Sequence, residues 1–321
     1  MKTVSAGIHH VTAIAGDPQR NLDFYAGTLG LRLVKRTVNF DDPGSYHFYF
    51  GDEAGSPGSI LTFFPWPGAR RGRPGVGQVG ATALAVPAGS LGWWIERFVA
   101  MGVEHDMPAR RFGLPVLAFR DPDGLPLELV ADARSASRGA WTGGDVPAEH
   151  AIRGVHAVTL DLARTDATAR VLTEALGFRE EGREGDVTRY AAGDGGPGTL
   201  VDLRTGAAGQ PLGGAGTVHH VAWRAADDAA ELEIRRQVEA LGLHPTPVID
   251  RNYFHSVYFR EPGGVLFEIA TDPPGFTDDE PAESLGQALK LPPQYEPRRA
   301  EIERILPPVR LPVAAGAAEA R

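Results

Sequence analysis

Cysteine is absent from this chain of 321 residues. Its absence excludes disulfides, thiolate metal ligands and a cysteine nucleophile. The N-terminal residues have no apolar stretch of the kind that marks a secretory signal. An uninterrupted apolar run of about 18 residues, long enough to cross a membrane, is also missing. We therefore expect a cytoplasmic protein without a membrane partner.

Positive charge is scarce relative to negative charge. Lys and Arg total 32 whereas Asp and Glu total 41, which gives a net charge of −9 with His neutral. Such a chain has no basic field to attract phosphates, so we expect no nucleic-acid partner. Hydrophobic residues make up 42% and charged residues 23%. This composition is typical of a globular protein, and the length suggests about two domains.

Internal repeats organise the chain. The segment RDPDGLPLELVAD around Arg120 aligns with REPGGVLFEIATD around Arg260 at an offset of 140 residues. The same offset places Gly102 of VAMGV on Gly242 of EALGL. The alignment therefore holds without a gap across half of each repeat, which is the pattern of a repeated structural unit.

A second pair of repeats aligns at an offset of 147 residues. The segment GIHHVT at Gly7 matches GVHAVT at Gly154, and Gly30 of GTLGL falls on Gly177 of EALGF. Together the two offsets define four units. Their approximate ranges are 7–66, 77–132, 153–204 and 215–272.

Every unit has the same predicted order of elements. An alternating or β-rich stretch opens the unit, a helical segment ending at a glycine follows, and short strands separated by turn signals complete it. The predicted fold class is therefore α+β, with four βαβββ units that form two barrel-like domains. Along the sequence we divide the chain into a first pair of units at 1–139, a second pair at 140–272 and a C-terminal tail at 273–321, which contains the short helical candidate RRAEIERIL.

Several segments within about residues 7–297 match the motifs of one family and follow one another in the same order. They include HHVTAIAGDPQRNLDFY, LRLVKRTVNFDDP, YHFYFGDEAGSPGSILTFFP, HHVAW, RNYF, REPGGVLFE and GFTDDEPAESLGQALKLPPQYE. The βαβββ repeat with these motifs resembles the vicinal oxygen chelate superfamily, and most closely its ring-cleaving hydroquinone dioxygenases. The resemblance implies Fe(II), O₂ and a small dihydroxylated aromatic substrate.

In this superfamily the metal-ligand positions lie on the first and last strands of each unit. The aligned first-strand positions hold His10, Gly80, Ala157 and His220, and the last-strand positions hold Thr62, Glu128, Asp202 and Glu268. The set His10, His220 and Glu268 supplies the two histidines and one carboxylate that suit non-haem Fe(II), and Mn(II) accepts the same set. Because these residues belong to units 1 and 4, we predict that units 1 and 4 share a metal-bearing barrel. Units 2 and 3 then form a metal-free barrel.

Both histidine-bearing strands carry two adjacent histidines. Side chains alternate between the two faces of a strand, so His9 shares a face with Val11, and His219 with Val221. That face is expected to pack on helices, which favours His10 and His220 as ligands and leaves His9 and His219 as neighbours of the site. In unit 3, His156 aligns with His9 and is expected to be a core residue.

Four further residues are candidates for the chemistry. Tyr258 lies on the strand that turns back into the Glu268 strand, where a phenol could hydrogen-bond substrate. Arg251 resembles an arginine near the substrate in the hydroquinone dioxygenases and could stabilise oxyanion charge. Thr12 and His219 are weaker candidates next to the ligands, and His219 or Tyr258 could move protons.

The expected function is insertion of both atoms of O₂ into a para-dihydroxylated aromatic ring. Three alternatives stay open: a catechol extradiol dioxygenase, a glyoxalase-like lyase or isomerase, and a non-catalytic resistance protein that binds a small molecule. Thr62 stands where a glyoxalase has a fourth ligand, which counts against the lyase. We also expect a homo-oligomer.

Overall fold

The computed structural model describes residues 3–207 and 209–311, which form two eight-stranded sheets. The strands of the first sheet are β1 (Ile8–Ala15), β2 (Arg32–Asn39), β3 (Asp42–Gly51), β4 (Ile60–Pro65), β13 (Thr217–Ala225), β14 (Ile249–Asp250), β15 (Phe254–Arg260) and β16 (Leu266–Pro274). Their order in space is β14-β15-β16-β13-β1-β4-β3-β2. This sheet is therefore built from units 4 and 1, as the ligand pattern predicted.

The second sheet contains the two remaining units. Its strands are β5 (Gln78–Val86), β6 (Ala109–Arg111), β7 (Leu114–Arg120), β8 (Pro126–Ala131), β9 (Val155–Asp161), β10 (Arg179–Glu184), β11 (Val187–Ala191) and β12 (Leu200–Arg204). Their order is β10-β11-β12-β9-β5-β8-β7-β6, so units 3 and 2 lie side by side. Each sheet thus takes one unit from either side of the proposed sequence boundary at 139/140, which itself stays a prediction.

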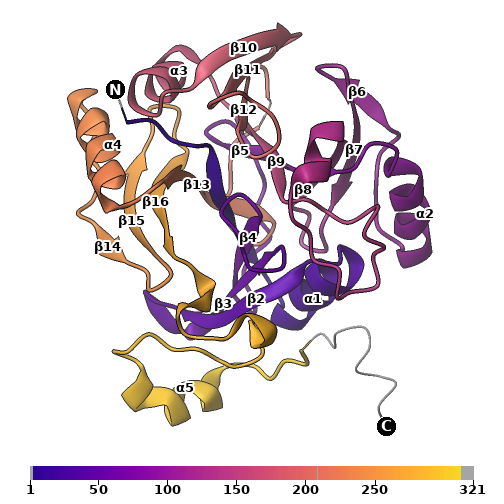
Figure 1. Ribbon diagram of the computed structural model, residues 1–321, viewed down its shortest axis with the longest axis vertical. Coiled ribbons are helices and arrows are strands. Elements are labelled where there is room, and N and C mark those ends of the chain that lie inside the picture. Colours follow the sequence, from indigo (N-terminus) through magenta and orange to yellow (C-terminus); the bar gives the residue numbers. More distant parts are fainter. Residues whose placement is uncertain (1–2, 208, 312–321) are drawn as a thin grey trace.

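Each unit has the predicted internal connectivity. Its first strand pairs in parallel with its last strand, as β1 does with β4 and β13 with β16, and its other neighbours are antiparallel. The two units of a sheet join through their first strands, β1 with β13 and β5 with β9, in antiparallel pairs. In Figure 1 the indigo and orange units consequently lie together although they are far apart in sequence.

The helices differ between the two kinds of unit. In units 1 and 3 a short α-helix continues into a π-helix: α1 (Pro18–Leu22) into η1 (Asp23–Thr28), and α3 (Asp166–Arg170) into η3 (Val171–Ala175). Units 2 and 4 have regular helices, α2 (Leu91–Met101) and α4 (Asp228–Ala240). The difference matches the two sequence offsets, which paired unit 1 with 3 and unit 2 with 4. The predicted terminal glycines all have positive φ, for example 67° at Gly102, where a Cβ would be strained.

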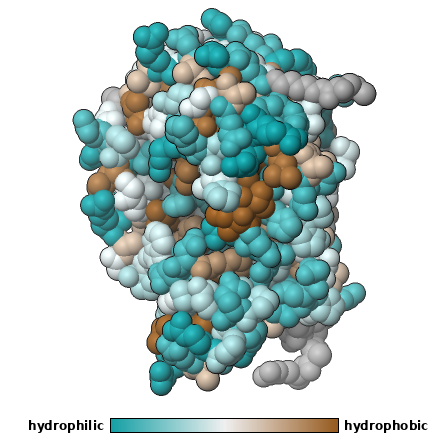
Figure 2. Space-filling view, turned by 90° about the vertical axis from the view of Figure 1, so that its left-hand side faces the viewer, coloured by the Kyte–Doolittle hydropathy of each residue, from teal (hydrophilic) through white to brown (hydrophobic). Residues whose placement is uncertain are grey.

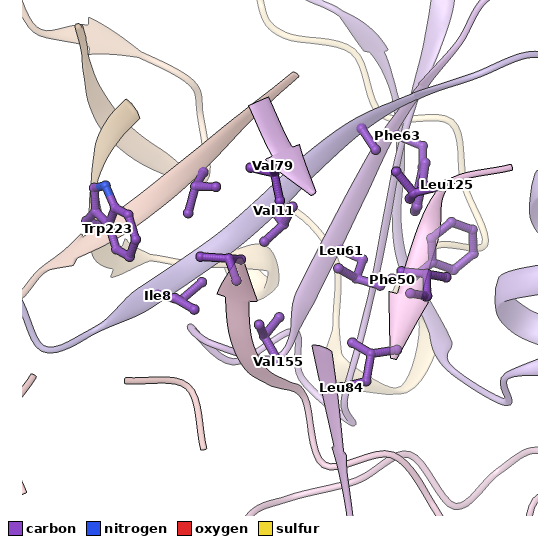
Figure 3. Close-up of a cluster of buried hydrophobic side chains, with 14 of the residues drawn as sticks. Ile8, Val11, Phe50, Leu61, Phe63, Val79, Leu84, Leu125, Val155 and Trp223 are labelled. Carbon is purple, nitrogen blue, oxygen red and sulfur yellow. The ribbon is translucent and has the colours of Figure 1, made fainter. Parts of the chain in front are cut away.

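A continuous apolar core lies between the sheets and their helices. Figure 3 shows Ile8, Val11 and Trp223 of units 1 and 4 beside Val79 and Val155 of units 2 and 3. These side chains come from the central strands of both sheets and are almost completely buried. The core therefore holds one face of the strands that carry the proposed ligands. The ligand side chains on the other face keep fixed positions relative to one another.

The described part of the tail packs over unit 1. After the short 3₁₀ segments Phe276–Asp278, Ala282–Ser284 and Glu296–Arg298, the tail forms α5 (Arg299–Ile305), the helix expected from its sequence. Figure 1 shows this yellow segment running beneath β2 and β3. Fully buried Lys35 of β2 donates to Asp279 and Glu280 of the tail at 2.6 Å each. The end of the tail, 312–321, lies outside the described residues.

The surface is mainly hydrophilic on the face shown in Figure 2, with a compact hydrophobic patch near its centre.

A short 3₁₀ segment, Ala133–Ser137, begins the connector between units 2 and 3. Within the described residues, every helix is too short or too polar to cross a bilayer.

Candidate metal centre

Three buried side chains converge on one point inside the sheet of units 1 and 4. Glu268 Oε2 lies 2.8 Å from His220 Nε2 and 3.2 Å from His10 Nε2, and the two Nε2 atoms are 3.3 Å apart. Within the described residues this is the one group of three potential ligands whose donor atoms lie within 4.8 Å of one another. The arrangement brings together the three residues that the repeat alignment selected.

Strand register places these residues side by side. Ala222 of β13 pairs with His10 of β1 on one side and with Glu268 of β16 on the other. His220, two residues before Ala222, pairs with Thr12 of β1. The three side chains therefore rise from three adjacent strands at the joint between units 1 and 4, where the backbone is held on both sides.

The donor atoms fit a cation. Glu268 is completely buried, and its Oε2 has no hydrogen-bond partner of suitable geometry, although Oε1 accepts from Ser256. Burial alone would raise the pKa of Glu268, but His10 and His220 outweigh it and hold its pKa well below the usual range. A buried carboxylate that stays ionised against two imidazole nitrogens is the environment of a divalent metal ligand set.

Two β-bulges correct the expected alternation at the paired histidines. The β1–β13 register shifts between Ile8 and His10 and again between Thr12 and Ala13, so His9 and His219 each occupy an extra position. Both residues contact the ligand histidines, as expected for neighbours of the site, but His219 also lines the cavity above the triad, so the predicted helix-packed face was wrong for His219. A bulged residue is not bound by strict alternation.

The bulges give each ligand histidine a supporting neighbour. Nδ1 of His10 lies 2.9 Å from Nδ1 of His9, and Nδ1 of His220 lies 2.8 Å from Nδ1 of His219. Burial lowers the pKa of His219 to about 4, which leaves it a neutral acceptor at pH 7. Each ligand histidine can thus donate its Nδ1–H to a neighbour and keep Nε2 free, the usual outer contact of a metal-bound imidazole.

A cavity of 320 Å³ opens above the triad. Its walls are aromatic and polar, and the lining residues are His10, Asn39, Phe40, Asp41, Asp42, His47, Tyr49, Phe64, Trp66, His219, His220, Arg251, Phe254 and Tyr258. Such a volume admits a single substituted benzene ring, and the aromatic walls can pack on its faces.

Of the other sequence candidates, Tyr258 and Arg251 also line this cavity, whereas Thr12 does not. Tyr258 pairs with Glu268 across the β15–β16 hairpin, as its position before the turn suggested, and its ring lies 5.7 Å from that of His220. Arg251 Nε donates to Tyr258 Oη at 3.3 Å. Burial, followed by the Glu268 carboxylate, raises the pKa of Tyr258 and keeps the phenol protonated. Thr12 lies deeper, where its Oγ1 is 3.0 Å from Thr62 Oγ1.

Sequence reasoning missed His47. Its Nε2 lies 2.6 Å from Thr62 Oγ1 and its Nδ1 lies 2.9 Å from Tyr49 Oη. Burial, followed by His10 and His220, holds its pKa well below the usual range. The alternation in YHFYF could have found it, because Tyr46, Phe48 and Phe50 face the core and leave His47 on the cavity side.

The sheet of units 2 and 3 has arginines in place of metal ligands. Glu128 accepts from Arg111, whose Nε lies 3.6 Å from Asp202 Oδ2. Asp202 is fully buried and accepts hydrogen bonds from Arg189 at 2.7 and 2.8 Å. Both carboxylates at ligand positions are therefore neutralised by guanidinium groups.

Comparison with known proteins agrees with this geometry. Residues 7–129 match the model of the Glyoxalase/Bleomycin resistance protein/Dioxygenase superfamily. The chain is 51% identical over 309 residues to the "Putative ring-cleaving dioxygenase MhqO" of Bacillus subtilis, with 96% of this chain and 98% of the relative covered. The chain belongs to this superfamily.

Within the superfamily its full-length relatives are ring-cleaving dioxygenases. The chlorohydroquinone/hydroquinone 1,2-dioxygenase of Sphingobium indicum is 37% identical, with 94% of this chain and 95% of the relative covered. A crystal structure from Bacillus subtilis has 50% identity and a TM-score of 0.93, covering 97% of this chain and 99% of the other. Glyoxalase I from Zea mays, at 16% identity and a TM-score of 0.61 over 83% of this chain and 92% of its own, shares the fold.

Proposed function

We propose that this protein is an Fe(II)-dependent ring-cleaving dioxygenase that inserts both atoms of O₂ into a hydroquinone-type aromatic. The observation that carries the proposal is the His10–His220–Glu268 triad at the floor of an aromatic-walled cavity. Three protein ligands leave coordination positions for substrate and O₂. The relative from Sphingobium indicum, whose name specifies chlorohydroquinone and hydroquinone, supports the para-diol. Mn(II) fits the same ligands.

The metal and the chain contribute different parts of the chemistry. A bound Fe(II) would lower the pKa of a coordinated ring hydroxyl and provide the place where O₂ reacts. Arg251 and Tyr258 form a hydrogen-bonded pair in the cavity wall and can donate to oxygen atoms that gain negative charge. His219 and Thr12, on the same strands as the ligands His220 and His10, are the further candidates for moving protons or orienting the substrate.

The glyoxalase-like alternative is disfavoured by the fourth ligand position. Thr62 occupies it, and its hydroxyl lies 3.0 Å from Thr12 Oγ1 and 2.6 Å from His47 Nε2. A threonine held in this way is neither a carboxylate nor a histidine. A binding-only protein has no need of a ligand set with open positions, and oxygen uptake separates it from a dioxygenase.

The function is tested by loading the protein anaerobically with Fe(II) and following O₂ uptake with hydroquinone and catechol in parallel. We expect uptake with hydroquinone in wild type and in His156→Ala, and loss of uptake in His10→Ala. Uptake with catechol alone would keep the dioxygenase activity but change the assigned substrate class from para-diols to ortho-diols. The absence of uptake with either diol would overturn the dioxygenase. Light scattering of the same preparation tests the expected homo-oligomer.

A further inference from the structure

The mouth of the cavity carries an unusual balance of charge. Of the residues that line the cavity in the described part of the chain, Arg251 alone is a Lys or Arg, whereas Asp41 and Asp42 both contribute carboxylates. These two aspartates lie where the chain passes from β2 to β3 in unit 1, and Arg251 lies just after β14 in unit 4. The two units therefore meet across the mouth with opposite charges.

Asp41 already occupies the open side of Arg251. Arg251 Nη2 lies 3.2 Å from Asp41 Oδ2 and Nη1 lies 3.5 Å from Oδ1, so the contact is two-pronged. The side chain of Asp41 is 76% exposed, whereas that of Arg251 is 18% exposed. On its inner side, Arg251 donates to Tyr258. The positive charge of Arg251 is therefore already neutralised by Asp41, on the solvent side, before a substrate enters the cavity.

The position of Asp41 is fixed by its surroundings. Its backbone N–H donates to the side chain of Asn39 at 3.0 Å, which forms a tight local turn. The preceding carbonyl, that of Phe40, accepts from Tyr295 Oη of the tail at 2.8 Å. The tail runs under this part of unit 1 in Figure 1, so the carboxylate is presented by a braced hairpin.

We propose that Asp41 sets the charge selectivity of the cavity, admitting uncharged aromatic diols and excluding those that carry a carboxylate. The proposal rests on the proposed function, because it concerns the substrate class of the same site. A neutral diol can accept a hydrogen bond from Arg251 without displacing Asp41. A carboxylated diol must pass Asp41 and Asp42 and then meets Arg251 already paired, so no Lys or Arg side chain lining the cavity is left to neutralise its charge.

Two probes of nearly equal shape test this selectivity: 2,5-dihydroxyphenylacetate and its uncharged amide, 2,5-dihydroxyphenylacetamide. An acetate side chain is preferable to a ring carboxylate, because a carboxylate next to a ring hydroxyl can chelate a metal itself. Binding is measured by titration calorimetry under argon with Mn(II)-loaded protein, so the readout does not depend on turnover. We expect wild type to bind the amide at least about tenfold more tightly than the acetate.

Asp41→Asn should reduce this discrimination to about threefold or less by strengthening acetate binding, with amide binding nearly unchanged. Asp41→Glu, which keeps the charge, should retain the wild-type preference. Asp42→Asn is the matched control, because it removes the same charge from the mouth without releasing Arg251. In the double variant Asp41→Asn/Arg251→Gln the gain in acetate binding should disappear.

Three results would overturn the proposal: equal binding of both probes to wild type, an equal effect of Asp42→Asn and Asp41→Asn, or persistence of the gain when Arg251 is replaced. A wild-type protein that takes up no O₂ with either diol defeats the proposed function instead. The binding experiment remains interpretable in that case, so the two failures are distinguishable.

Discussion

His10 and His220 each keep one ring nitrogen for the cavity and direct the other at a neighbouring histidine. Their Nε2 atoms share a single buried carboxylate oxygen, that of Glu268. A proton on one Nε2 atom could link that nitrogen to the Glu268 oxygen but would leave the other nitrogen unlinked. A metal ion could bind all three atoms at once. The chemistry of these three residues is therefore decided by their convergence and not by any one of them.

Tyr258 is expected to act directly on the substrate. Its phenol stays protonated because its pKa is raised, and Arg251 donates to its oxygen, so its own O–H can point to substrate. Tyr258→Phe should lower kcat/KM for hydroquinone by about 10²-fold. Steady-state O₂ uptake measures the effect. Tyr190→Phe, a buried tyrosine of the other sheet, is the control, and an equal loss there would indicate a general effect on folding.

Some of the site's residues could be predicted from the sequence and others could not. His10, His220 and Glu268 occupy equivalent positions of a repeat, so alignment of the chain with itself was sufficient to find them. His47 lies outside the aligned ligand positions, although the alternation in YHFYF places it on the cavity side. Asp41 has no signal of either kind, because it reaches the cavity through the hairpin position across from unit 4. Contacts between distant units depend on the assembled fold.

The bulges in β1 and β13 change the antiparallel pairing that joins units 1 and 4, next to the ligands His10 and His220. Each inserts one residue beside a ligand histidine and so places a second imidazole against it, and that of His219 also lines the cavity. The sequence predicted these strands and their ligands, but alternation alone placed His219 on the face away from the cavity. The π-helical turns of units 1 and 3 also went unpredicted, since π-turns differ from α-helix by one residue in hydrogen bonding.

Helix α4 supports a prediction about pH. Glu231, in its first turn, is completely buried with neither carboxylate oxygen hydrogen-bonded, and burial raises its pKa to about 7. The folded state therefore binds a proton that the unfolded state releases between about pH 4.5 and 7, so the stability contributed by this group falls as pH rises through that window.

The variant Glu231→Gln should be more stable than wild type by about 2 kcal/mol at pH 8 and nearly equal to it at pH 4.5. Urea unfolding at both pH values measures the difference. Glu233→Gln, on the exposed side of the same helix, should show little effect. A Glu231→Gln variant that is no more stable at pH 8 would contradict the assignment.

The two eight-stranded sheets of the molecule share one arrangement of strands but differ in the side chains at the aligned ligand positions. In the sheet of units 1 and 4 the aligned positions supply metal ligands, and in the sheet of units 2 and 3 Arg111 and Arg189 neutralise the carboxylates. The absence of histidine from the aligned ligand positions of units 2 and 3 predicted the difference. The arginines that take over the neutralisation were not predicted, because they lie on strands outside the aligned ligand positions.

Arg111 tests this contrast. Arg111→Met would leave Glu128 without its partner and should destabilise the protein by about 3 kcal/mol at pH 8. Arg110→Met is the matched control, since Arg110 is an exposed neighbour on the same strand that donates only to Gly113 O. Equal unfolding midpoints for the two variants would contradict the pairing.

If units far apart in the chain build one metal site, metal content after anaerobic loading with Fe(II) and dialysis must depend on residues of both units. We predict about one ion per chain in wild type and in His156→Ala, and almost none in His10→Ala, His220→Ala or Glu268→Gln. Full metal content in His10→Ala, or its loss only in His156→Ala, would contradict the account.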